Sequence, residues 1–205
     1  MRRLTFIIGL LLCITLGVQA KGRNVNETKY AGYLFAYFEG RGEGSQREHL
    51  RFAVSTDARN WHALNGNHPV ISSDSISESD GIRDPHIMRG EDGCFYIVAT
   101  DMNTFKNGWK ENPGIVLMKS RDLVNWSHSQ INLGKDWPAF ADAYWVWAPQ
   151  TIYDRKAGKY MIYFTLQRTG DNRKSLITYY TYMPTKISLA LRVSPRSCSV
   201  LNTAA

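Results

Sequence analysis

Cysteine is scarce in this 205-residue sequence, which contains three. Three cysteines are too few for the disulfide frameworks that hold many small secreted domains together. Cys94 and Cys198 could form one bridge at most, and we predict none. Cys13 follows a leucine where a lipidation site needs a small residue, so we predict no lipid anchor. The stability of the fold must come from a hydrophobic core, for which 43% hydrophobic residues provide the material.

An excess of charge of one sign is missing from most of the chain. The formal net charge is +7, which by itself suggests nucleic acid or an acidic surface as a partner. However, two of the 25 basic residues lie at the N-terminus, and five lie after residue 171, where there is no acidic residue. The other basic residues balance the 18 acidic residues of the segment 21–171. We predict no nucleic-acid partner, because binding to phosphates requires clustered positive charge.

Long hydrophobic runs are absent after the N-terminus. Residues 1–3 carry two arginines, residues 4–18 are mostly apolar, and the small residue Ala20 follows. This order is typical of a secretory signal peptide, and the apolar run is short for a membrane span. We predict a signal peptide at residues 1–20 and a secreted or periplasmic mature chain, with no membrane contact beyond export. The alternative is an uncleaved membrane anchor.

Convincing helical periodicity is also missing, and short apolar strands repeat instead. Strands are predicted at residues 33–38, 49–55, 95–100, 114–120 and 159–165. The sequence S-x-D-x-x-N-W occurs at Ser55–Trp61 and again 65 residues later, at Ser120–Trp126. Aromatic strands with such a repeat are typical of β-propeller blades, which are small sheets buried by their neighbours. The alternative is a β-sandwich with an accidental repeat.

The end of the chain does not follow the repeat. From Met183 onward there is no acidic residue, no aromatic residue and no alternating strand. Reading the codons in a shifted frame permits Ala-Asn-Lys-Asp-Phe-Thr after Tyr182, which restores the missing turn element. We therefore predict a partial propeller domain at residues 21–182 and an aberrant basic tail at 183–205, produced by a frameshift near Tyr182. A genuine irregular basic tail is the alternative.

One motif carries candidate chemistry, Gly81-Ile-Arg-Asp-Pro-His-Ile87. Pro85 removes a backbone donor and favours an extended conformation at Asp84, which can then point a carboxylate out of the start of a strand. With E-D-x-x-F-Y-I at 91–97, the second S-x-D element and W-A-P at 147–149, the motif resembles glycoside hydrolase family 43. The resemblance covers roughly residues 30–182.

This resemblance implies an all-β fold, a five-bladed propeller of which the chain holds about two and a half blades. It also implies inverting hydrolysis of glycans that contain arabinose, xylose or galactofuranose. Inverting enzymes use a carboxylic acid and a carboxylate base about 6.5–9.5 Å apart, so that a water molecule fits between base and sugar. Asp84 matches the base position, and nearby Arg83 is expected to lower its pKa. The alternative for Asp84 is a structural turn carboxylate.

The family's general acid and the aspartate that tunes it belong to later blades, beyond Tyr182. Glu39, Glu43, Glu91 and Glu111 do not lie where the family places its acid. The chain as written is therefore expected to lack its general acid.

Four residues form the predicted substrate-binding set, Arg83, His86, Asp101 and Trp147. Trp147 can stack on a sugar face, or it can pack between blades. Asp101 can contact sugar hydroxyls, or it can cap a turn, and His86 is expected to pack or to orient a neighbour. No residues have metal-ligand spacing. We predict no cofactor, although some relatives hold a central calcium whose ligands are not identifiable in this sequence.

The sequence therefore predicts an exported inverting glycosidase, similar to α-L-arabinofuranosidases and β-xylosidases. Its partner is an oligosaccharide or polysaccharide, with side chains of plant-type or microbial polysaccharides as substrate. The missing acid predicts an impaired or inactive enzyme. The alternatives are a non-catalytic glycan-binding propeller fragment and a non-functional pseudogene product.

Overall fold

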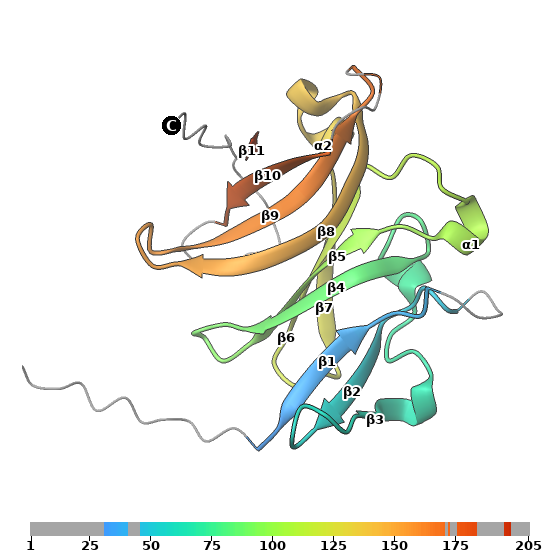
Figure 1. Cartoon of the computed structure of the whole chain (residues 1–205), viewed down its shortest axis with the longest axis vertical. Coiled ribbons are helices and arrows are strands. Elements are labelled where there is room, and N and C mark those ends of the chain that lie inside the picture. The colour runs from blue at the N-terminus through green and yellow to red at the C-terminus, as the bar shows by residue number, and fades with distance from the viewer. Residues whose placement is uncertain (1–30, 41–45, 171, 173–175, 184–194, 198–205) are drawn as a thin grey trace, which may run out of the picture. The chain divides into compact units, whose positions relative to one another are not determined.

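The computed structural model describes residues 31–40, 46–170, 172, 176–183 and 195–197, which form three antiparallel sheets (Figure 1). The first sheet has the order β1 (Tyr33–Tyr37), β2 (Arg51–Ser55), β3 (His62–Ala63). The second contains β4 (Ile82–Arg89), β5 (Phe95–Asp101), β6 (Gly114–Ser120) and β7 (Trp126–Asn132). The third contains β8 (Ala143–Asp154), β9 (Lys159–Arg168), β10 (Ile177–Tyr182) and β11 (Arg196–Ser197). Short helical turns are α1 (Thr104–Asn107), α2 (Leu133–Asp136), η1 (Leu64–Asn67), η2 (Ser73–Ser75) and η3 (Pro138–Phe140).

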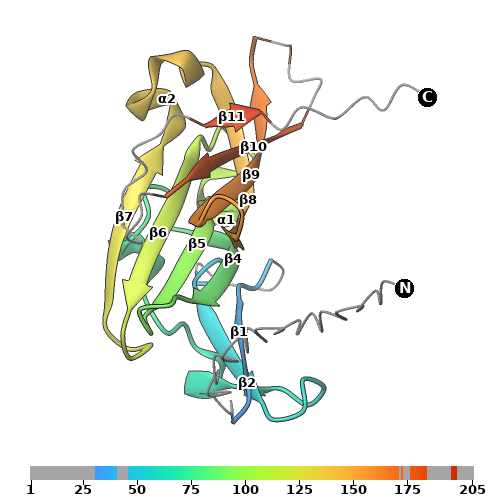
Figure 2. The same cartoon turned by 90° about the vertical axis from the view of Figure 1, so that its left-hand side faces the viewer.

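The four strands of the second sheet lie side by side in Figure 2, and its two central strands, β5 and β6, are buried on both faces. Along β5, Ile97 and Ala99 join the core cluster shared with the first sheet, whereas Val98 joins the cluster shared with the third. The same alternation continues on β6, where Val116 faces one cluster and Leu117 the other. Strands buried on both faces are apolar throughout, which explains the uninterrupted hydrophobic runs of β5 and β6.

The repeated S-x-D-x-x-N-W sequence forms the same turn twice, after β2 and after β6. In both turns the aspartate carboxylate accepts the N–H groups of the residues two and three positions ahead, at 2.9 and 2.8 Å. The asparagine amide donates to the second carboxylate oxygen, at 2.7 Å in one turn and 2.8 Å in the other. These hydrogen bonds hold the pKa of Asp57 and of Asp122 well below its usual value. The residue after each aspartate is left-handed, Ala58 at φ 59° and Leu123 at φ 65°.

All five predicted strands are present, as β1, β2, β5, β6 and β9, with boundaries that shift by at most three residues. The residue patterns gave no range for β3, β4, β7 or β8. In the predicted tail, Met183 packs into the core, and Arg196–Ser197 forms β11 against β10. The aberrant tail and the frameshift near Tyr182 stay predictions.

The predicted signal peptide, residues 1–20, and Cys198 lie outside the described residues. Cys94 is buried and has a free thiol. Among the residues that the structure describes, no helix is long and apolar enough to cross a membrane.

Candidate functional site

Asp84 lies at a bulge in β4, where the pairing with β5 shifts between Arg83 and His86. Its backbone is left-handed, with φ 49°, so the predicted extended conformation is wrong. The bulge inserts an extra residue into the strand, and aspartate is one of the few residues that tolerate this conformation. A strained backbone at an exposed carboxylate is a common feature of functional sites.

β8 repeats this bulge 64 residues later, at Ala148, which also has φ 49° and also precedes a proline. Thr100 connects the two bulges. Its Oγ1 donates a hydrogen bond to Asp84 Oδ2 at 3.1 Å and accepts one from the Ala148 N–H at 2.9 Å. One oxygen of the exposed Asp84 carboxylate is thus fixed by the protein, and Oδ1 has no protein partner within the described part of the chain.

Arg83 does not pair with Asp84. Its Nη1 forms an ion pair with Oε1 of Glu48, whose side chain has no exposed surface. The guanidinium lies over the rings of Phe38 and Trp109, at 4.6 and 5.2 Å from their centroids. The charge of Arg83 is therefore balanced by Glu48. The predicted role of Arg83 in tuning Asp84 has no direct contact to support it in the described residues.

Trp147 is half-buried in a cluster of tryptophans beside Ala148. Its ring stacks on Trp145 at a centroid distance of 4.1 Å, and its Nε1 donates to Asn112 Oδ1 at 2.9 Å. Trp109 meets Trp147 edge-on, at 6.2 Å, and is 62% exposed. Trp109 was not predicted from the sequence, although a lone tryptophan in a polar loop is a signal for an exposed aromatic residue.

The two remaining predicted site residues are tied to the protein. Asp101 is buried, and its two carboxylate oxygens accept the N–H groups of Glu78 and Ser79 at 2.9 and 3.0 Å. These are the contacts of a turn cap, which was the alternative to sugar binding for this residue. Burial raises the pKa of Asp101. His86 Nδ1 accepts the Thr151 N–H at 3.2 Å and so joins β4 to β8, while burial lowers its pKa.

Within the described residues, no group of three or more histidine, cysteine or acidic side chains is arranged to hold a metal ion.

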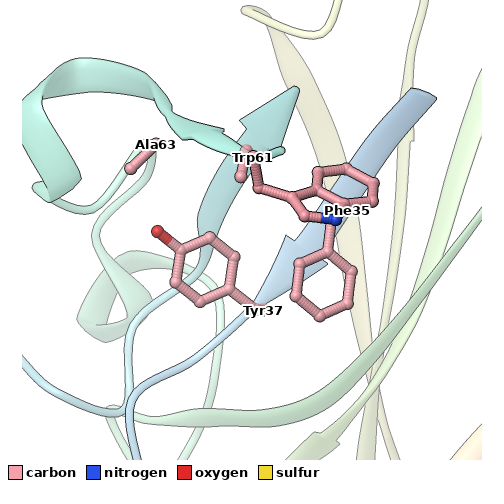
Figure 3. Close-up of a pocket in the computed structure, with 5 residues that line it drawn as sticks. Phe35, Tyr37, Trp61 and Ala63 are labelled. Carbon is pink, nitrogen blue, oxygen red and sulfur yellow. The ribbon is translucent and has the colours of Figure 1, made fainter. Parts of the chain in front are cut away.

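An aromatic pocket of about 410 Å³ lies on the first sheet (Figure 3) and is lined by Phe35, Tyr37, Ala53, Trp61 and Ala63. The rings of Phe35 and Tyr37 stack at 5.5 Å, and Trp61 is tilted against Phe35 at the same distance. Among the residues that the structure describes, no carboxylate or histidine lines the pocket. The described lining is an aromatic and largely apolar contact surface.

Residues 28–186 match the model of a family related to glycoside hydrolase family 43, described as "Probable glycosyl hydrolase domain". An α-L-arabinofuranosidase of Bifidobacterium longum subsp. longum is 23% identical over 169 residues, which are 79% of this chain and 15% of that protein.

Two solved structures share the fold. An endo-1,4-β-xylanase from Bacteroides thetaiotaomicron has a TM-score of 0.55 at 14% identity, over 82% of this chain and 48% of that one. An exo-1,5-α-L-arabinanase from a bovine ruminal metagenomic library has a TM-score of 0.50 at 13% identity, over 82% and 51%. The chain thus spans about half the length of these structures. Its three sheets are blades of an incomplete β-propeller, which confirms the predicted fold class.

Proposed function

The chain belongs to the glycosyl hydrolase family related to family 43, and on that premise we propose that it is an inverting glycosidase with Asp84 as its general base. The observation that carries this proposal is the Asp84 carboxylate itself, exposed at a strained bulge of β4 with one oxygen held by Thr100. Trp147 is the neighbour of Ala148, whose N–H donates to the Thr100 hydroxyl that also holds Asp84. Its half-buried indole can stack on a sugar ring.

In this mechanism Asp84 Oδ1 accepts a proton from a water molecule. The water oxygen forms a bond to the anomeric carbon on the face opposite the leaving group, and the glycosidic C–O bond breaks. The leaving oxygen takes a proton from a general acid. We assign no general acid to the described residues, because the resemblance places the acid in a later blade and Glu48 is fully buried against Arg83.

Pentose-containing glycans are the substrates we propose, with arabinofuranosides first and xylosides second. The names of the curated relative and of the two structural neighbours support this choice, since they are an arabinofuranosidase, a xylanase and an arabinanase. The positive, apolar and small-residue order of residues 1–20 supports export of the chain.

The experiment is hydrolysis of p-nitrophenyl α-L-arabinofuranoside and p-nitrophenyl β-D-xyloside by the full chain. Nitrophenolate leaves with little need for protonation, so a site that holds the base alone still turns these substrates over. We expect measurable release, with the inverted sugar anomer formed first in ¹H NMR spectra. A retained anomer would contradict the role of Asp84 as a base.

Glycan binding without catalysis is the second candidate, favoured because no general acid is assigned among the described residues. In that case, the chain binds arabino- or xylo-oligosaccharides in calorimetric titrations but releases no nitrophenol. A chain that shows no cooperative melt by circular dichroism would support the pseudogene alternative instead.

A further inference from the structure

The connection between β5 and β6 presents Trp109 to solvent beside the Asp84 strand. The indole is 62% exposed, which is unusual for so large an apolar side chain. Arg83 lies over its ring, and Trp147 meets its edge. These two contacts restrain the ring, and part of its surface stays exposed to solvent.

This connection is anchored before any ligand arrives. Asn103 caps α1 by accepting the Lys106 N–H at 2.9 Å, and its side-chain amide donates to the Asp80 carbonyl at 2.9 Å. The side chain of Asn107 donates to the Ser79 carbonyl at 3.1 Å. A ring on an anchored loop loses little conformational entropy when a ligand binds, so its contact area is available for affinity.

A single buried carboxylate joins this loop to the strand that carries Asp84. Glu48 accepts hydrogen bonds from Thr104 Oγ1 and, at 3.1 Å, from the Phe105 N–H, both in the loop. It also accepts one from Arg83, the neighbour of Asp84. Movement of Glu48 would therefore displace both Arg83 and the base of the loop that bears Trp109.

We propose that Trp109 is a sugar-stacking residue of the Asp84 site and that Glu48 is its positioning residue. The ligand is a neutral pentose, whose C–H face packs on the indole while its hydroxyl groups remain in water. This inference rests on the proposed function, because it places the sugar within reach of Asp84.

The test is calorimetric titration of the full chain with two probes, α-1,5-linked arabinotriose and β-1,4-linked xylotriose. Trp109→Ala should weaken binding of the preferred probe by about tenfold or more, because truncated tryptophans are frequent binding hot spots. Trp109→Phe should recover most of the affinity, since it keeps an aromatic face. Trp61→Ala is the matched control, a 40% exposed tryptophan in the pocket of the first sheet, and should leave affinity unchanged.

Glu48 is tested by a double-mutant cycle at a temperature well below the melting transition. Glu48→Gln should weaken binding in the wild-type background and have little further effect in Trp109→Ala, because it acts through that ring. Equal effects in both backgrounds would overturn the positioning role.

The outcomes separate this inference from the proposed function. Wild-type binding with unchanged affinity in Trp109→Ala would overturn the inference and leave the proposed function standing. Loss of binding in Trp61→Ala alone would move the sugar to the first-sheet pocket and overturn the inference as well. A wild-type chain that binds neither trisaccharide and releases no nitrophenol would overturn both.

Discussion

The pair formed by Glu48 and Arg83 should be the costliest single contact to break in the described chain. The Glu48 side chain has no exposed surface, and the Arg83 side chain is only 15% exposed. Glu48→Gln keeps the shape but leaves the guanidinium with no counter-charge in a largely dry position. Removing one partner of a buried ion pair typically costs about 3–5 kcal/mol, a large share of the roughly 5–15 kcal/mol that stabilises an ordinary domain.

Urea denaturation followed by circular dichroism measures this cost. Glu91→Gln, which changes an exposed turn residue in the same way, is the matched control and should shift the unfolding free energy by about 0.5 kcal/mol at most. Arg83→Met should also destabilise the fold. The double variant Glu48→Gln/Arg83→Met should cost less than the two single changes together, by about 1–3 kcal/mol. A loss below about 1 kcal/mol for Glu48→Gln, or strict additivity, would refute the reasoning.

Two further predictions concern the turns and the interface between β4 and β8. Ala58→Gly should raise the unfolding free energy by about 0.5–1 kcal/mol, since it relieves a left-handed φ of 59°; urea curves that show no gain would contradict this strain. Burial lowers the pKa of His86, so the folded state favours the neutral imidazole. The stability of the fold that depends on this neutral form is fully present above pH 6.5, the ordinary pKa of histidine. It is lost as the pH falls below 6.5, because the unfolded state binds the proton first. The urea midpoint of unfolding should therefore decrease as the pH is lowered from 7.5 to 5.5, and it should decrease less in His86→Phe. An equal decrease in both proteins would contradict the assignment.

The strands that could be predicted are those with an uninterrupted pattern. β5 and β6 are apolar on both faces, and β1 is aromatic, so residue type alone identified them. β4 and β8 were missed because Asp84-Pro and Ala148-Pro interrupt each strand with a bulge. A bulge shifts every later side chain to the other face, so the alternation with a period of two is lost.

The site could be predicted only where a motif marks it. Asp84 was found from the D-P motif, but its left-handed backbone depends on the pairing of β4 with β5. Glu48 and Arg83 are 35 residues apart, and only the packing of the first two sheets brings them together. Trp109 lies in a connection that the repeat does not cover, so no spacing pointed to it.

The most direct test of the central claim compares p-nitrophenyl α-L-arabinofuranoside hydrolysis by the full chain and by Asp84→Asn. The control is Asp74→Asn, which removes an equal charge from an exposed turn outside the site. Loss of a general base should lower the rate by about 10²–10⁴-fold in Asp84→Asn, while the control keeps the wild-type rate. Hydrolysis by Asp84→Asn at the wild-type rate would contradict the assignment of Asp84 as the general base.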